Sequence, residues 1–231
     1  MIEETEVQAH LTAHQGRLMA RVWHPRLGFA NPGGQPASVS IRLQVPARGA
    51  YRVRTEAFHG LVAVRRLTLA SATLRGAVGE KFKGIPGFIG ATELDNVELA
   101  GDVDIDNLAG LPGIRPSVAP EQAAPTAPIL VKARIASSCQ LKAATGGDIN
   151  IAIQPNPSLG VRAWGGANNG AVRVSIDGGV KRDGAVGEFR NQDQMESSGY
   201  NDKPIRVEAR AISTHGKVNI ASIPAAPLQP R

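Results

Sequence analysis

Three observations predict an all-β fold, built as a repeat-based β-solenoid or β-roll. Glycine and proline account for 26 and 16 of the 231 residues, and Val, Ile and Thr are plentiful whereas runs of helix-forming residues are scarce. Apolar and polar residues alternate in short stretches such as "ATGGDINIAI", residues 144–153. A glycine precedes this alternation several times along the chain. A chain of this length can bury a substantial core, so we expect strands joined by frequent turns.

The recurring unit reads Gly-x-(Val/Ile)-x-(Val/Ile). Its five copies begin at Gly60, Gly101, Gly147, Gly170 and Gly216. These glycines lie 41, 46, 23 and 46 residues apart, which is close to one or two multiples of about 23. Fixed periods of this size are typical of solenoids, in which each unit buries its apolar face against the next. We therefore predict coils of roughly 23 residues, some of which have lost the pattern. The alternative is a β-sandwich with hairpins every 8 to 12 residues.

Each repeat unit combines a corner with a strand. Glycine allows the tight bend that a corner requires. The alternation after Gly147 sends Ile149 and Ile151 to one face of a strand and Asp148 and Asn150 to the other. Stacked units would then form a continuous ladder of Val and Ile inside the domain.

The domain prediction rests on proline. Residues 115–129 hold four prolines among small residues, and such a segment cannot pair inside a sheet, so we expect a surface loop there. We predict a single elongated β domain over residues 1–223 and an extended tail over residues 224–231. Near the start of the chain, "VQAHLTAHQGRLMARVW" predicts a hairpin around His14, Gln15 and Gly16. Its strand would hold His10 and His14 ~13 Å apart, too far for one metal ion.

The N-terminus lacks the basic and apolar regions of a secretory signal, and no stretch reaches the ~18 apolar residues that cross a bilayer. We therefore expect no transmembrane segment. The compartment is cytoplasmic if the chain is complete, and the cell envelope if an export signal was removed. The single cysteine, Cys139, excludes a disulfide within the chain.

Three stretches carry a family resemblance: "ASVSIRLQVPARGAYRVRTEAFHGLVAV", "LKAATGGDINIAI" and "VEARAISTHGKVNI". In the first, a strand ends in Val-Pro before a further strand and a glycine turn. In the others, a short polar segment precedes the glycine unit. Over residues 38–220 the chain resembles the bacterial "putative adhesin" β-strand-repeat family, a domain of unknown function. The resemblance implies a right-handed strand-repeat solenoid, often found on exported or membrane-attached proteins, with no catalytic residues. The export signal or membrane helix that members commonly carry is not seen here.

Charge is segregated along the chain. Residues 1–90 carry a net charge of +7, residues 91–127 a net charge of −6, and residues 128–231 a net charge of +5. The overall basic balance permits attraction to polyanions such as nucleic acid or cell-envelope polymers. The candidate polyanion-binding residues are Arg48, Arg52, Arg54, Arg65 and Arg66. Period-2 alternation places two of them, Arg52 and Arg54, on one strand face. The alternative is a solvated basic face, because aromatic residues that could stack on bases are few.

The acidic segment over residues 93–107 sets Asp102, Asp104 and Asp106 on one strand face. Three carboxylates on one face suggest a cation-binding site. The spacing of a calcium-binding EF-hand loop is not met, because Asn107 occupies the position that requires glycine and Gly113 the position that requires glutamate. We therefore predict no metal site. The segment is a solvated face, or a patch complementary to the basic half of a neighbouring molecule.

The remaining reactive or aromatic residues favour structural roles. Cys139 has no local base partner and is expected inside a strand. His59 and His215 each precede a repeat glycine and should occupy equivalent corners. The glycine pair of "WGGANNG", residues 164–170, is interpreted as a turn without the Lys and Ser/Thr of a phosphate loop. Trp164 is interpreted as a core or cap residue rather than a ligand platform.

The sequence therefore predicts a non-catalytic structural or interaction protein with no cofactor. The alternative is polyanion binding through the basic face. Self-association is a further expectation, either through exposed strands at the solenoid ends or through the charge-segregated faces.

Overall fold

The computed structural model describes residues 8–14, 17–23, 44–46, 48–57, 61–76, 91–107, 128–183 and 189–222. The chain divides into two compact units, residues 1–45 and residues 46–231, and each is described by itself. The predicted domain over residues 1–223 stays a prediction. The predicted tail, His59 and Gly60 lie outside the described residues, as does the predicted proline loop except for Pro128 and Ile129.

The first unit contains a β-hairpin. Strands β1 (Gln8–His14) and β2 (Arg17–Trp23) pair antiparallel, with His14 opposite Arg17. The antiparallel pairing of the two predicted strands is confirmed, whereas residues 15 and 16 lie outside the described residues.

The second unit contains one 14-stranded sheet. Its strands are β3 (Ala50–Ala57), β4 (Leu61–Arg65), β5 (Thr68–Gly76), β6 (Ala91–Leu99), β7 (Val103–Asp106), β8 (Ile129–Ile135), β9 (Cys139–Thr145), β10 (Ile149–Ile153), β11 (Leu159–Ala167), β12 (Val172–Ser175), β13 (Gly179–Lys181), β14 (Asn191–Ser197), β15 (Ile205–Ser213) and β16 (Val218–Ser222). A three-residue 3₁₀ helix, η2, covers Tyr200–Asp202. In the described part of the chain no helix has the length and apolar character to cross a membrane.

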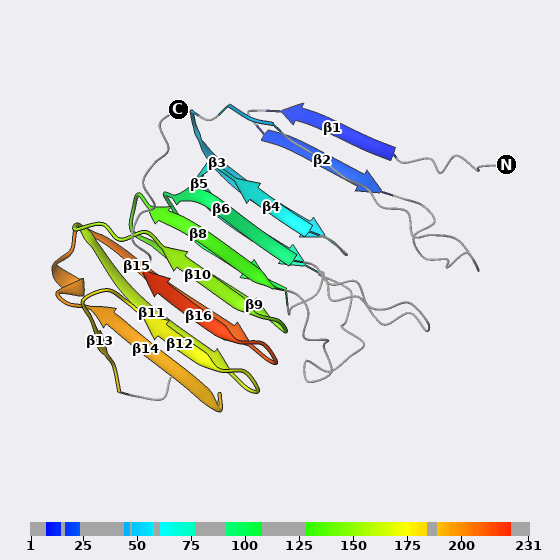
Figure 1. The fold of residues 1–231 in the computed structure, drawn as a ribbon. Helices are drawn as coiled ribbons and strands as arrows, with labels where there is room; N and C mark the ends of the chain where they lie inside the picture. Colours follow the sequence, from blue (N-terminus) through cyan, green and yellow to red (C-terminus); the bar gives the residue numbers. More distant parts are fainter. Residues whose placement is uncertain are drawn as a thin grey trace, which may run out of the picture. The chain divides into compact units, whose positions relative to one another are not determined.

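The sheet folds over so that two rows of strands face each other across the core (Figure 1). Row 1 runs β4, β6, β8, β10, β16, β12, and row 2 runs β3, β5, β7, β9, β15, β11, β14. A short pairing of β5 with β6 joins the rows. Neighbours within a row pair parallel, except that β14 is antiparallel to β11, and β13 pairs antiparallel with β14 beyond the end of row 2. The predicted all-β class is confirmed; the repeat-built solenoid and the β-sandwich stay predictions.

Consecutive strands alternate between the rows from β3 to β12, so that β9 of row 2 leads to β10 of row 1 and β11 leads to β12, and β15 of row 2 leads to β16 of row 1. The order of these strand pairs in space differs from their order in the chain. The last pair, β15 and β16, lies between the β9–β10 pair and the β11–β12 pair (Figure 1). The β15–β16 pair therefore separates two pairs that both precede it in the chain.

Alternation along the strands decides what enters the core. On β10, Ile149, Ile151 and Ile153 are at most 1% exposed, whereas Asn150 is exposed. Parallel register aligns Ile149 with Val218 of β16, and the same valine with Val172 of β12. Burial of each such side chain contributes about 1.5 to 3 kcal/mol. The inward positions of Ile149 and Ile151 and the outward positions of Asp148 and Asn150 agree with the sequence prediction.

Three of the repeat glycines stack directly at one corner, between row 2 and row 1. A Cβ atom at Gly216 would lie 2.1 Å from the carbonyl carbon of Gly147, and one at Gly170 would lie 1.8 Å from the carbonyl oxygen of Gly216. Backbones this close exclude any side chain. Gly101 lies at the opposite corner, before β7, where a Cβ would be 1.9 Å from the carbonyl oxygen of Ala70. The repeat glycines therefore serve both corners of the fold.

The glycine pair of "WGGANNG" lies inside a strand, so its interpretation as a turn was wrong. Gly165 and Gly166 belong to β11, and the bend follows at residues 168–170. A Cβ at Gly165 would lie 2.7 Å from Val172 Cγ1, and one at Gly166 would lie 2.9 Å from Phe189 Cδ2. The two glycines make room for side chains packed on both faces of β11.

We expect Gly216→Ala to lower the free energy of unfolding by more than about 3 kcal/mol, because the new methyl group meets backbone that cannot move aside. Gly178→Ala is the control: it has a left-handed φ of 62° but nothing within 4 Å of the new Cβ. We expect it to cost only about 1 kcal/mol. Urea unfolding of both variants measures the difference, and equal losses would contradict the stacked corner.

Candidate functional site

The structure separates the five predicted polyanion-binding arginines. Arg52 and Arg54 share the outer face of β3 in row 2, as period-2 alternation predicts, and both are exposed. Arg65 lies on β4 in row 1. Arg48 and Arg66 are exposed in bends, where Arg66 adopts a left-handed φ of 57°. The five residues therefore do not share one strand face.

The three acidic side chains of β6 form ion pairs within the molecule. On the outer face of β6, Glu93 pairs with Arg65 of β4 at 3.0 Å, and Asp95 pairs with Lys132 of β8 at 3.6 Å. Glu98 pairs with Arg134 of β8. Segments of opposite charge in the sequence thus become neighbours in row 1. The basic partners are more than half exposed and the carboxylates are 25 to 36% exposed, so solvent screens each pair, which contributes about 0 to 1 kcal/mol.

Of the three aspartates predicted to share a strand face, two lie on the outer face of β7. Asp104 and Asp106 are half-buried on β7, whereas Asp102 precedes the strand and accepts a hydrogen bond from the Gln140 backbone N–H at 2.8 Å. Across the ranges that the structure describes, no three His, Cys, Asp or Glu side chains are grouped so as to hold a metal ion.

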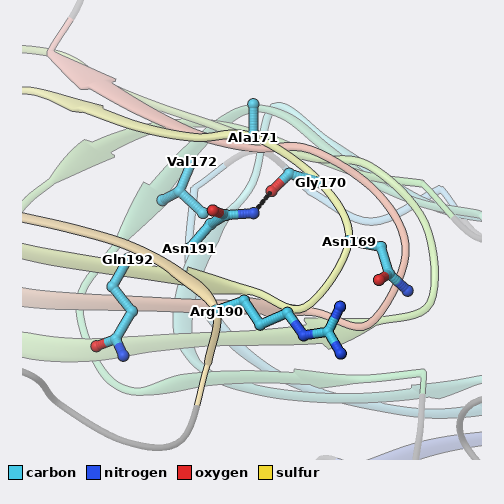
Figure 2. Close-up of a pocket in the computed structure, with 7 residues that line it drawn as sticks. All are labelled: Asn169, Gly170, Ala171, Val172, Arg190, Asn191 and Gln192. Carbon is cyan, nitrogen blue, oxygen red and sulfur yellow. Dashed lines mark hydrogen bonds between the residues drawn. The ribbon is translucent and has the colours of Figure 1, made fainter.

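A recess of about 530 Å³ lies beside the corner before β12 (Figure 2). Its lining residues are Asn169, Gly170, Ala171, Val172, Arg190, Asn191 and Gln192. Asn191 Nδ2 donates to the Gly170 carbonyl at 2.9 Å. Below the recess, the Val174 N–H donates to Asp193 Oδ2 at 2.8 Å. The side chains of β14 thus bridge to β12, and the lining offers an arginine and amides but no general base.

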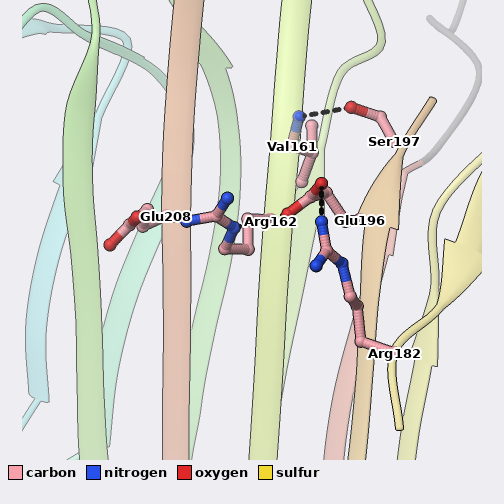
Figure 3. Close-up of polar contacts among 6 residues, drawn as sticks. All are labelled: Val161, Arg162, Arg182, Glu196, Ser197 and Glu208. Carbon is pink, nitrogen blue, oxygen red and sulfur yellow. Dashed lines mark hydrogen bonds and ion pairs between the residues drawn. The ribbon is translucent and has the colours of Figure 1, made fainter. Parts of the chain in front are cut away.

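An ion-pair cluster covers the outer face at the β14 end of row 2 (Figure 3). Arg162 of β11 donates from Nε to Glu196 of β14 at 2.6 Å, and from Nη1 to Glu208 of β15 at 3.1 Å. Arg182 donates to the second oxygen of Glu196. The Arg162 guanidinium also lies 4.3 Å from the ring centroid of Tyr200. The sequence analysis missed this cluster, because its members meet only once the order of the strands is known.

The cluster shifts the acidity of its members. Burial would raise the pKa of Glu196, but hydrogen bonds and charge from Arg162 and Arg182 outweigh burial and leave that pKa lowered. Burial raises the pKa of Tyr200, and the nearby carboxylate of Glu208 adds to the effect. The arrangement therefore keeps Glu196 ionised, and its two arginine partners occupy both of its oxygens.

The other single residues occupy structural positions. Cys139 begins β9 and is 7% exposed, and burial, followed by the charge of Asp102, raises its thiol pKa to about 11. His215 lies in the bend before Gly216, where its Nδ1 is hydrogen-bonded to Thr214 Oγ1 at 2.9 Å. Trp164 is buried on the outer face of β11, in edge contact with Phe189 at 5.7 Å, and its Nε1 has no hydrogen-bond partner among the described residues. It therefore caps the outside of the sheet.

No protein-family model and no curated protein matches the sequence. Among solved structures, the chain is similar to a "putative cell adhesion protein" from Clostridium sporogenes ATCC 15579. The identity is 13%, the alignment covers 95% of this chain and 78% of that chain, and the TM-score is 0.33.

We expect Glu196→Gln to lower the free energy of unfolding by about 1 to 2 kcal/mol at pH 7, because two arginines lose a carboxylate partner. A carboxyl group with a lowered folded pKa stabilises above its unfolded pKa of about 4.3, and this contribution disappears as the pH falls through the folded pKa. The wild type and the variant should therefore converge towards pH 2. Urea titrations at both pH values measure this, with Glu98→Gln, which removes a single exposed pair, as the milder control. A difference that persisted at low pH would contradict the ion-pair origin.

We expect the Cys139 thiol to resist modification in the folded protein. At pH 8, a thiol with a pKa of about 11 is roughly one-thousandth thiolate, and burial adds a steric barrier. Ellman's reagent should react at least roughly a hundred times faster in guanidinium chloride, where it reads one thiol per chain. Equal rates in the two states would show that the thiol is accessible.

Proposed function

We propose that the chain is a non-catalytic structural or interaction module, built as a repeat-based β-solenoid whose outer strand faces contact partners. The main observation behind this proposal is the parallel register of β12, β16 and β10. It aligns Val172, Val218 and Ile149 in one row. Glycine corners without side chains allow this stacking. Such a stack presents side chains in fixed rows at strand spacing, which suits contact with an extended partner.

The placement of reactive groups supports a non-catalytic role. The Cys139 thiol is buried and its pKa is raised, which suppresses the nucleophilic thiolate. The carboxylate of Glu196 is occupied by two arginines, and His215 is hydrogen-bonded to Thr214 within its bend. Each of these groups is taken up by local structure rather than directed into the recess.

The β12 and β13 edges carry features that oppose strand addition. Asp193 accepts the hydrogen bond of the Val174 N–H at the edge of β12. Strand β13 is only three residues long and includes Lys181, which pairs with Asp193 at 3.5 Å. Short, charged edges of this kind discourage pairing with another chain. We therefore propose that self-association does not use these two edges.

The interaction role is tested with protein-coated beads. Fluorescent beads carrying the chain through a terminal biotin are flowed over glass coated with the same chain, with an acidic polysaccharide or with a neutral polysaccharide. We expect retention above that of albumin-coated beads on at least one surface, and its loss when the coating protein is unfolded. Retention no better than albumin on all three surfaces would count against the proposal.

A further inference from the structure

Charged side chains on the outer faces follow a rule of complementarity across neighbouring strands. The ion pairs are Arg65–Glu93, Lys132–Asp95, Arg134–Glu98, Arg162–Glu196, Arg162–Glu208, Lys181–Asp193 and Arg182–Glu196. Opposite charges on adjacent strands stabilise a sheet, and like charges directly opposite each other destabilise it.

One place in row 2 departs from this rule. Lys142 of β9 and Arg210 of β15 are directly in register on adjacent parallel strands, and both are exposed. Their backbones are therefore about 4.8 Å apart. Neither side chain has an ion-pair partner among the described residues. Two cations placed side by side cost stability that a neutral residue at either position would recover.

The surroundings leave Arg210 without an acid in register. Its neighbour on the other side is Trp164 of β11, which is buried under Phe189. Glu208, two residues earlier on β15, is hydrogen-bonded to Arg162. Lys142 has Asp104 of β7 in register on its far side. The positive charge is therefore concentrated between β9 and β15 and diminishes towards β7.

We propose that Lys142 and Arg210 together bind a carboxylate or sulfate group of an acidic polysaccharide. A guanidinium and an ammonium at strand spacing can share the oxygens of one such anion. Arg206, exposed four residues earlier on β15 and thus about 13 Å along the strand, meets a second anionic group of the same polymer. This inference rests on the proposed interaction role and gives it a ligand class.

Aromatic placement favours a polysaccharide over a nucleic acid. Single-stranded nucleic acid is held largely by bases stacked on exposed aromatic rings. The aromatic residues beside this surface are Trp164 and Tyr200, which are only 8% and 6% exposed, and Phe189, which is half-buried with its ring packed edge-on against Trp164. The surface thus offers charge on a flat sheet without a stacking platform.

The test is fluorescence anisotropy of a fluorescein-labelled heparin decasaccharide, titrated with the full chain at low and at physiological salt. We expect Lys142→Gln with Arg210→Gln to weaken binding at least tenfold and to reduce the slope of log affinity against log salt by roughly 2. The matched control is Arg173→Gln with Lys217→Gln, which removes the same charge from exposed positions of row 1 and its corner. We expect that control to lose less than twofold. The melting temperature of the first variant should not fall, because a like-charge pair has been removed.

Several results would overturn the inference. Equal weakening by both variants would assign binding to net charge alone, and an unlabelled thymidine 20-mer that competes as well as unlabelled heparin would assign the surface to nucleic acid. Absence of binding at low salt would exclude the site. None of these results would contradict the interaction role itself. The bead experiment tests that role separately, through retention on glass coated with the chain itself.

Discussion

The close approach of backbone at the glycine corners is the constraint on which the second unit depends. Where Gly147, Gly216 and Gly170 stack, no Cβ could be accommodated between the neighbouring bends. Strands that leave these corners start at the same level, so Ile149, Val218 and Val172 fall into one ladder. A slip of one residue would turn every apolar side chain outward. The corners therefore determine which side chains enter the core and which lie on the outer faces of the two rows.

Electrostatics acts on the outer faces that this register creates. Acidic β6 lies between basic β4 and β8, and Arg162 lies between acidic positions on β14 and β15. Since the basic partners on β4 and β8 are more than half exposed, the individual pairs of β6 add little free energy. Their effect is on pairing specificity, because a wrong neighbour would place like charges opposite each other. The segregation of charge along the sequence is thus a consequence of which strands become neighbours.

The features that could be predicted from the sequence are those that depend on local patterns. The alternation after Gly147 predicted which of residues 148–151 are buried, and the turn residues between His14 and Arg17 predicted the hairpin. The order of strand pairs could not be predicted, because the units after Gly147, Gly170 and Gly216 have equivalent patterns and any could lie in the middle. The ion-pair cluster around Arg162 and the adjacent Lys142 and Arg210 depend on that order. Gly165 and Gly166 were misread because only packing on both faces of β11 explains two glycines within a strand.

The position of the β15–β16 pair between β9–β10 and β11–β12 has a consequence for folding during synthesis. A ribosome releases β11 and β12 before β15 and β16, yet these earlier strands reach the rest of the stack only through the later ones. Until residue 222 has emerged, the apolar sides of β9–β10 and β11–β12 lack the strands that belong between them. A message truncated after β14 would therefore yield a product that lacks the strands joining β11–β12 to β9–β10, rather than one that is only shortened at its end.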